Sequence, residues 1–156
     1  MSALVRRPVA FISAIVLFAE AVGVVIVNGV MATFVKNQDM SLAGTDPGAM
    51  ANGAWVLGGI SGLFLLLCGV LLLLTGVRDR APGRIARVVL IGCAVIHGVL
   101  GALAVGLIGW TAFVSMMVVL GLIVLTLVAY GPGREEPATG SDTGADAEKP
   151  VAPAPA

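Results

Sequence analysis

The residues that could carry chemistry are a few polar side chains inside long apolar runs. Glu20 is the one carboxylate in the run 9–35, and it lies near the middle of that run. His97 is the only histidine, and it lies near the middle of the span 85–105. A charged carboxylate at the centre of a bilayer costs at least ~2.5–3.5 kcal/mol on insertion scales. We therefore expect Glu20 to be protonated or paired, and to face other helices or an aqueous cavity.

Two further polar residues share the helix expected to carry Glu20. Ser13 precedes Glu20 by two turns and aligns with it, whereas Asn28 follows two turns later, roughly 80° round the helix. Together they predict a polar line along an otherwise apolar helix. Counted at ~1.5 Å per residue from the ends of the two spans that are expected to face the cytoplasm, Glu20 and His97 come to similar depths. A Glu20–His97 pair between the first and third helices is therefore geometrically possible.

Three interpretations of this intramembrane polar set stay open. Polar side chains serve as interhelical links in membranes, so Glu20 could simply specify the bundle. It could instead titrate in a proton- or cation-responsive site tuned by His97, because intramembrane ionisable residues are functional candidates. A metal or thiol redox site from Cys68, Cys93, His97 and Glu20 has suitable ligand types. It lacks a CxxC motif, however, and lone core cysteines behave as small hydrophobes, so we expect no metal and no cofactor.

Catalytic motifs are otherwise missing from the sequence. It has no phosphate-binding glycine loop after a strand and no HExxH, and a serine nucleophile would have only the deep histidine as its base. Asp39 and Asp46 could bind a divalent cation weakly, although a solvated linker is the ordinary role of such acids. Basic residues are few and lie near helix ends, which excludes nucleic acid as a partner. We expect a protein that is not an enzyme.

Composition indicates that the solvent of this chain is lipid. Hydrophobic residues make up 58% of the chain and charged residues only 12%, about half of the ~25% typical of soluble domains. The charges cluster between uncharged runs, which is typical of a polytopic membrane protein. We predict an all-α, antiparallel up-down four-helix transmembrane bundle. Its parts are a basic leader (1–8), a bundle (9–131) with spans at 9–35, 54–77, 85–105 and 111–130, a loop at 36–53 with a turn at 46–48, and a disordered tail (132–156).

The distribution of lysine and arginine predicts the orientation. One side has Arg6 and Arg7, the arginines of the middle loop and Arg134, whereas the other has only Lys36. Both termini are therefore expected to face the cytoplasm across a bacterial cytoplasmic membrane. The middle-loop arginines could bind anionic lipid headgroups, although topology alone explains them; they are Arg78, Arg80, Arg84 and Arg87.

Small residues recur on one face of two spans and predict close helix packing, which in lipid depends on such residues. The second and third spans are joined by a short loop, so their stripes could pack against each other. One stripe could instead face a second protomer. The stripes are Gly58, Gly62, Gly69 and Gly76 in the second span, and Ala94, Gly98, Ala102 and Gly106 in the third.

The segment 14–28 reads AIVLFAEAVGVVIVN. With the fourfold hydrophobic pattern and the Ala/Pro-rich tail, the chain resembles small four-helix membrane proteins of actinobacteria. The resemblance implies a fold and a membrane location and no activity. We expect a non-enzymatic accessory or assembly subunit that associates with itself or with another membrane protein through its Gly/Ala faces. The alternative is a proton- or cation-responsive, transporter-like oligomer that uses Glu20.

Overall fold

The structure is a computed structural model that describes residues 3–38, 44–107 and 109–131. This part of the chain is all-helical, and the prediction of four helices long and apolar enough to cross a membrane is confirmed. The predicted disordered tail (132–156) lies outside the described residues. The helices are α1 (Ala3–Asn37), α2 (Pro47–Arg78), α3 (Arg84–Leu107) and α4 (Trp110–Ala129).

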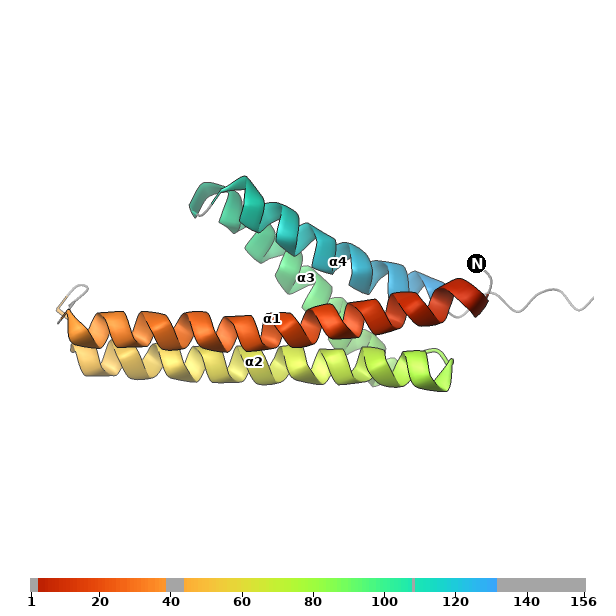
Figure 1. Cartoon of the computed structure of the whole chain (residues 1–156), viewed down its shortest axis with the longest axis horizontal. Coiled ribbons are helices and arrows are strands. Elements are labelled where there is room, and N and C mark those ends of the chain that lie inside the picture. Colours follow the sequence, from red (N-terminus) through yellow and green to blue (C-terminus); the bar gives the residue numbers. More distant parts are fainter. Residues whose placement is uncertain (1–2, 39–43, 108, 132–156) are drawn as a thin grey trace, which may run out of the picture.

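The four helices form a bundle of two hairpins (Figure 1). In the first hairpin, α1 and α2 lie side by side along their whole length; in the second, α3 packs mainly on α4. The hairpins meet where α1 begins and diverge toward the other end of α1, and α3 touches α2 over only a short stretch. The result is a splayed bundle, because the two hairpins share a core only toward the end where α1 begins.

Two helices begin earlier than predicted. α1 begins at Ala3 rather than residue 9, so Pro8 lies inside the helix. α2 begins at Pro47 rather than residue 54. The backbone N–H of Ala49 donates to Asp46 Oδ2 at 2.9 Å, so Asp46 is an N-cap. Acid followed by proline is a helix start as well as a turn signal, and much of the predicted loop 36–53 is therefore helical.

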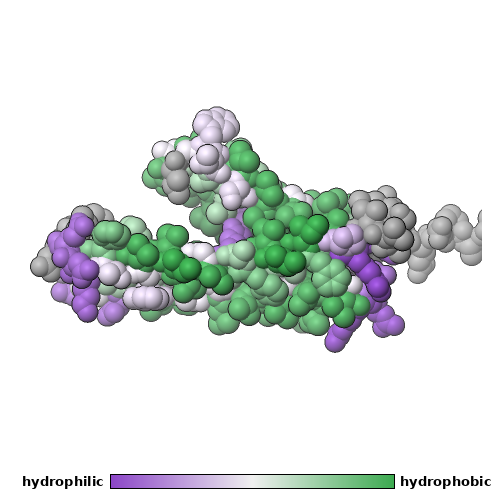
Figure 2. All heavy atoms as spheres, in the orientation of Figure 1, coloured by the Kyte–Doolittle hydropathy of each residue, from purple (hydrophilic) through white to green (hydrophobic). Residues whose placement is uncertain are grey.

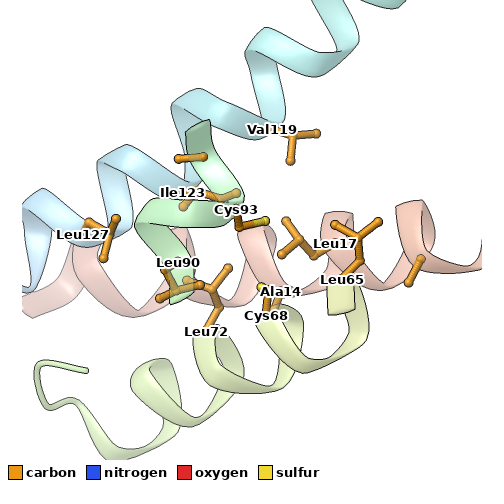
Figure 3. Packing of buried hydrophobic residues seen from close by; sticks show 12 residues of the cluster. Ala14, Leu17, Leu65, Cys68, Leu72, Leu90, Cys93, Val119, Ile123 and Leu127 are labelled. Atoms are coloured by element: carbon orange, nitrogen blue, oxygen red, sulfur yellow. The ribbon is translucent and has the colours of Figure 1, made fainter. Parts of the chain in front are cut away.

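The core lies where the two hairpins meet, and all four helices contribute to it (Figure 3). Figure 2 shows hydrophilic residues at the two ends of the first hairpin and a hydrophobic surface between them. Many large apolar side chains are exposed on that surface, and apolar residues all round a helix are typical of a membrane span. The side chains at the centre of the core are Ala14, Leu17, Leu65, Cys68, Leu72, Leu90, Cys93, Val119, Ile123 and Leu127.

The α2 glycine stripe packs against α1, a partner that neither of the two possibilities left open by the sequence included. A Cβ built on Gly62 would lie 2.5 Å from Val25 Cγ2, and one on Gly69 would lie 2.7 Å from Phe18 Cε1. Gly58 and Gly76 likewise face side chains of α1. These glycines let the first hairpin close along its whole length, whereas the short loop to α3 brings α2 and α3 together only near that loop.

The α3 stripe divides between burial and exposure. Ala94 is buried in the core, and a Cβ on Gly98 would lie 3.3 Å from Leu120 Cδ1 of α4. Ala102 and Gly106 are exposed, and nothing lies within 4 Å of a Cβ built on Gly106. The second hairpin therefore uses only part of the predicted stripe for its own packing.

Candidate functional site

The structure brings Glu20 and His97 into contact across the two hairpins. Glu20 Oε2 of α1 lies 2.9 Å from His97 Nε2 of α3. The His97 side chain is 4% exposed and that of Glu20 is 18% exposed. The two most strongly ionisable side chains of the predicted polar set therefore form one hydrogen bond inside the apolar part of the bundle.

The hydrogen bonds of the His97 ring determine where protons can sit. Nδ1 lies 2.8 Å from the backbone carbonyl oxygen of Cys93, one turn earlier on α3. A carbonyl oxygen only accepts, so Nδ1 carries a hydrogen. Nε2 then donates to Glu20 if the ring is cationic and accepts from it if the ring is neutral. In the first case Glu20 is a carboxylate, and in the second it is a carboxylic acid.

Both arrangements contain one proton between Nε2 and Oε2, and both have zero net charge. Loss of that proton would place a carboxylate against the lone pair of a neutral ring nitrogen. The contact would become repulsive, and the pair would carry a net negative charge. The 2.9 Å contact between Glu20 and His97 is therefore conditional on a bound proton, which is unusual for a link between helices.

The three residues of the predicted polar line of α1 have different partners: Glu20 contacts α3, Ser13 contacts α4, and Asn28 contacts its own helix. Ser13 Oγ donates to the Val9 or Leu122 carbonyl oxygen and lies 3.1 Å from Thr126 Oγ1 of α4. Asn28 Nδ2 donates to the Val24 carbonyl oxygen of its own helix at 2.8 Å. Ser13 therefore joins the hairpins beside Glu20, whereas Asn28 does not belong to the site. Thr126 is one of three hydroxyl side chains of α4, with Thr111 and Ser115, and no sequence pattern singled it out as the partner of Ser13.

Beyond Glu20 the two hairpins separate. Val27 and Met31 follow Glu20 on the same face of α1 by two and three turns, and they are 61% and 55% exposed. The hydroxyl of Thr33 donates to the Gly29 carbonyl oxygen of its own helix. Among the hydrogen bonds that the described residues make between α1 and the second hairpin, Glu20–His97 lies furthest from the start of α1. Figure 2 shows an open notch between the diverging hairpins.

A polar cluster joins three helices at the end where α1 begins. Tyr130 Oη donates to Asp79 Oδ1 at 3.2 Å, and Arg7 Nε lies 3.5 Å from Asp79 Oδ2. The Arg6 guanidinium carbon lies 5.6 Å from the centre of the Tyr130 ring, a cation–π distance. Burial, together with the charge of Asp79 and the hydrogen bond to it, raises the pKa of Tyr130, although Arg6 and Arg7 oppose this.

The cysteines lie near the site but are packed in the core. Cys68 and Cys93 are free thiols with no exposed surface, and Cys93 Sγ lies 3.7 Å from His97 Nδ1. Within residues 3–38, 44–107 and 109–131, no group of three His, Cys, Asp or Glu side chains is placed to hold a metal ion. Of the two predicted loop acids, Asp39 lies outside the described residues and Asp46 caps α2.

A groove on the surface of the first hairpin lies away from this chemistry. It has a volume of about 480 Å³ and runs along the second half of α1 beside Trp55. Gly29 lines it, nine residues after Glu20 and hence on the opposite side of α1. Its lining is mostly apolar, as expected of a surface that meets acyl chains, and it holds no titratable group.

Comparisons with protein-family models, with curated proteins and with solved structures find no match to this chain. The functional conclusions therefore depend on the geometry of the Glu20–His97 pair and on the elements that hold it.

Proposed function

We propose that the chain is a proton-responsive integral membrane protein in which Glu20 and His97 form a titratable joint between two transmembrane hairpins. One observation supports this most directly. Among the hydrogen bonds that the described residues make between α1 and the second hairpin, the one furthest from the start of α1 is the 2.9 Å contact of Glu20 with His97, which requires a shared proton. With the proton bound, the hairpins are held together at mid-depth; without it, the joint opens and the notch deepens.

The membrane placement is part of the proposal. We propose that the four helices cross a bacterial cytoplasmic membrane in up-down order, with both chain ends in the cytoplasm. The contact between Arg7 of α1 and Asp79 after α2 supports this, since it brings two arginine-bearing segments to one end of the bundle. We call this the arginine-rich end: it comprises the start of α1, the loop between α2 and α3, and the end of α4. A predominance of arginine at one end is typical of the cytoplasmic side.

The single histidine gives a direct test. In protein labelled with ¹⁵N-histidine and reconstituted in bilayers, solid-state NMR reports one pair of ring nitrogens. We expect Nδ1 to stay protonated over the whole titration, and Nε2 to change with pH. Glu20→Gln can donate an amide N–H to Nε2 but supplies no titratable proton. We expect that variant to hold His97 neutral and to remove the coupled titration.

Ser13→Ala is the matched control, because it removes a polar contact between the hairpins that carries no titratable group. It should leave the His97 titration unchanged. If His97 titrates with the same midpoint in Glu20→Gln as in the wild type, the carboxylate is not coupled to it, and the proposed function fails.

An accessory or assembly role is the second candidate. It is favoured by the open surface at Gly106 and the exposed Ala102 on the far half of α3. The α2 glycines already pack against α1. Of the two predicted small-residue stripes, only this part of α3 is therefore open to a partner helix. Ala102→Cys should form a cross-link in native membranes, and Gly106→Leu should abolish it. Full labelling of the thiol without any cross-link would exclude this role.

A further inference from the structure

A pocket of about 290 Å³ lies at the arginine-rich end, where α2 ends and α3 begins. Arg78 and Arg80 line it, and Pro82 and Gly83 of the connecting loop form part of its wall. Its volume corresponds to roughly ten water molecules. A phosphate group with a few waters fits that space, and the guanidinium group is the side chain best matched to phosphate.

Within the part of the chain that the structure describes, the two arginines of the pocket have no counter-ion. Among the described residues, the ion pairs are Arg7–Asp79 and Glu20–His97, and neither involves Arg78 or Arg80. Asp79 lies between these arginines in sequence but takes a left-handed backbone conformation (φ 49°). Its two carboxylate oxygens contact Arg7 and Tyr130 at the side of α1 and α4. The acid that adjoins both arginines in sequence is therefore already engaged by Arg7 and Tyr130.

The helix ends at this pocket do not themselves decide its charge preference. The N-terminus of α3 favours an anion, and the C-terminus of α2 favours a cation. Since the two ends meet at one short loop, their partial charges offset each other to first order. The net attraction for an anion therefore comes from the side chains of Arg78 and Arg80.

The side of the pocket formed by α2 carries apolar residues that lie before the arginines along the helix. Leu71 and Leu74 line it, two turns and one turn before Arg78, and Leu74 is 40% exposed. An anionic group at one end and an exposed leucine wall at the other match the two parts of a phospholipid. We propose that this pocket binds an acidic phospholipid, with its phosphate on Arg78 and Arg80 and an acyl chain along Leu71 and Leu74.

Native mass spectrometry of the full-length protein tests this proposal, with added phosphatidylglycerol, phosphatidylcholine or inorganic phosphate. We expect phosphatidylglycerol to bind in preference to phosphatidylcholine, and millimolar inorganic phosphate not to displace it. The Arg78→Gln/Arg80→Gln double variant should lose about 25-fold in affinity for phosphatidylglycerol, at about fivefold for each arginine near a membrane surface.

Two further variants separate the pocket from general charge. Arg84→Gln removes an exposed arginine that does not line the pocket, so it should change the affinity by less than twofold. Ala86→Phe fills the pocket and keeps every arginine, so it should weaken binding as the double variant does. Three results would each overturn the proposal: that the protein retains both lipids equally, that Arg84→Gln loses as much affinity as the double variant, or that Ala86→Phe binds normally. Displacement by inorganic phosphate would overturn its lipid part. None of these outcomes depends on the titration of Glu20.

Discussion

Opening of the joint between the hairpins on proton loss can be measured directly as a distance. The perturbation is a rise in pH through the titration of His97, with Glu20→Gln as a variant that keeps a neutral hydrogen bond. Spin labels on Met31 of α1 and Leu103 of α3 would report it, because these side chains are 55% and 56% exposed. Both positions lie beyond the Glu20–His97 contact, on the diverging arms of the bundle.

The expected change in distance follows from the length of α1 beyond Glu20. Met31 lies eleven residues beyond Glu20, which is about 16 Å at 1.5 Å per residue. Each 10° of opening about the joint then moves the label by about 3 Å. The change in the populations of open and closed forms follows from the energy of the Glu20–His97 hydrogen bond. A hydrogen bond to a charged group contributes about 1.5–3 kcal/mol. Its loss would shift the ratio of open to closed forms about 10- to 150-fold.

Double electron–electron resonance in lipid nanodiscs would give the distance distribution at each pH. Cys68 and Cys93 are fully buried, and protein without the added cysteines would measure background labelling. We expect the wild-type distribution to lengthen as pH rises, Glu20→Gln to keep the short distance throughout, and Ser13→Ala to follow the wild type. A distribution that is the same at all pH values, or that lengthens equally in Glu20→Gln, would refute the proton-dependent joint.

Three further predictions concern the elements that hold the site. Gly62→Val should destabilise the first hairpin by about 1–3 kcal/mol, because its Cβ would meet Val25 Cγ2 at 2.5 Å. Unfolding in denaturing detergent measures this loss, with Gly59→Val as the control because nothing lies within 4 Å of a Cβ at Gly59. Equal losses of stability in the two variants would contradict the close packing of Gly62 on α1. Asp46→Ala should cost about 1 kcal/mol of helix stability and speed hydrogen exchange in the first turn of α2; unchanged exchange would contradict the cap. Tyr130, the only tyrosine, should ionise above its ordinary pKa of about 10 in an absorbance titration, and Asp79→Asn should lower that midpoint. Because the pKa of Tyr130 is raised in the folded state, the stability that this group contributes is fully present below its unfolded-state pKa and is lost as pH rises through its folded-state pKa. A titration midpoint that Asp79→Asn leaves unchanged would exclude the Asp79 carboxylate as a cause of the raised pKa.

The four apolar helices could be predicted because lipid imposes a length and a composition on every spanning segment. Their ends were less predictable. Acid followed by proline at Asp46 and Pro47 is equally typical of a turn and of a helix start, and only the hydrogen bond from Ala49 distinguishes them. The tie of Arg7 to Asp79 lies outside any local pattern, because it joins segments far apart in the sequence.

Depth along each helix gave the Glu20–His97 pairing as a possibility, because rise per residue is nearly constant. Rotation about the helix axis and the crossing angle were not predictable in the same way. They determine that Ser13 meets α4 and that Asn28 turns back to its own helix. The direction of the α2 glycines toward α1 also depends on them, since a small-residue stripe does not specify its partner.

The proton dependence that we propose for the joint has a consequence for the hydration of the Glu20–His97 pair. While one proton is shared, the Glu20–His97 pair is neutral as a whole, so lipid imposes little penalty on it. Proton loss leaves a net negative charge, which costs at least ~2.5–3.5 kcal/mol at the bilayer centre if it stays dry. Water entering the notch would offset that cost, because Glu20 is already 18% exposed in the closed form. Opening and hydration are therefore one event in this mechanism, and the notch should take up water only when the pair has lost its proton.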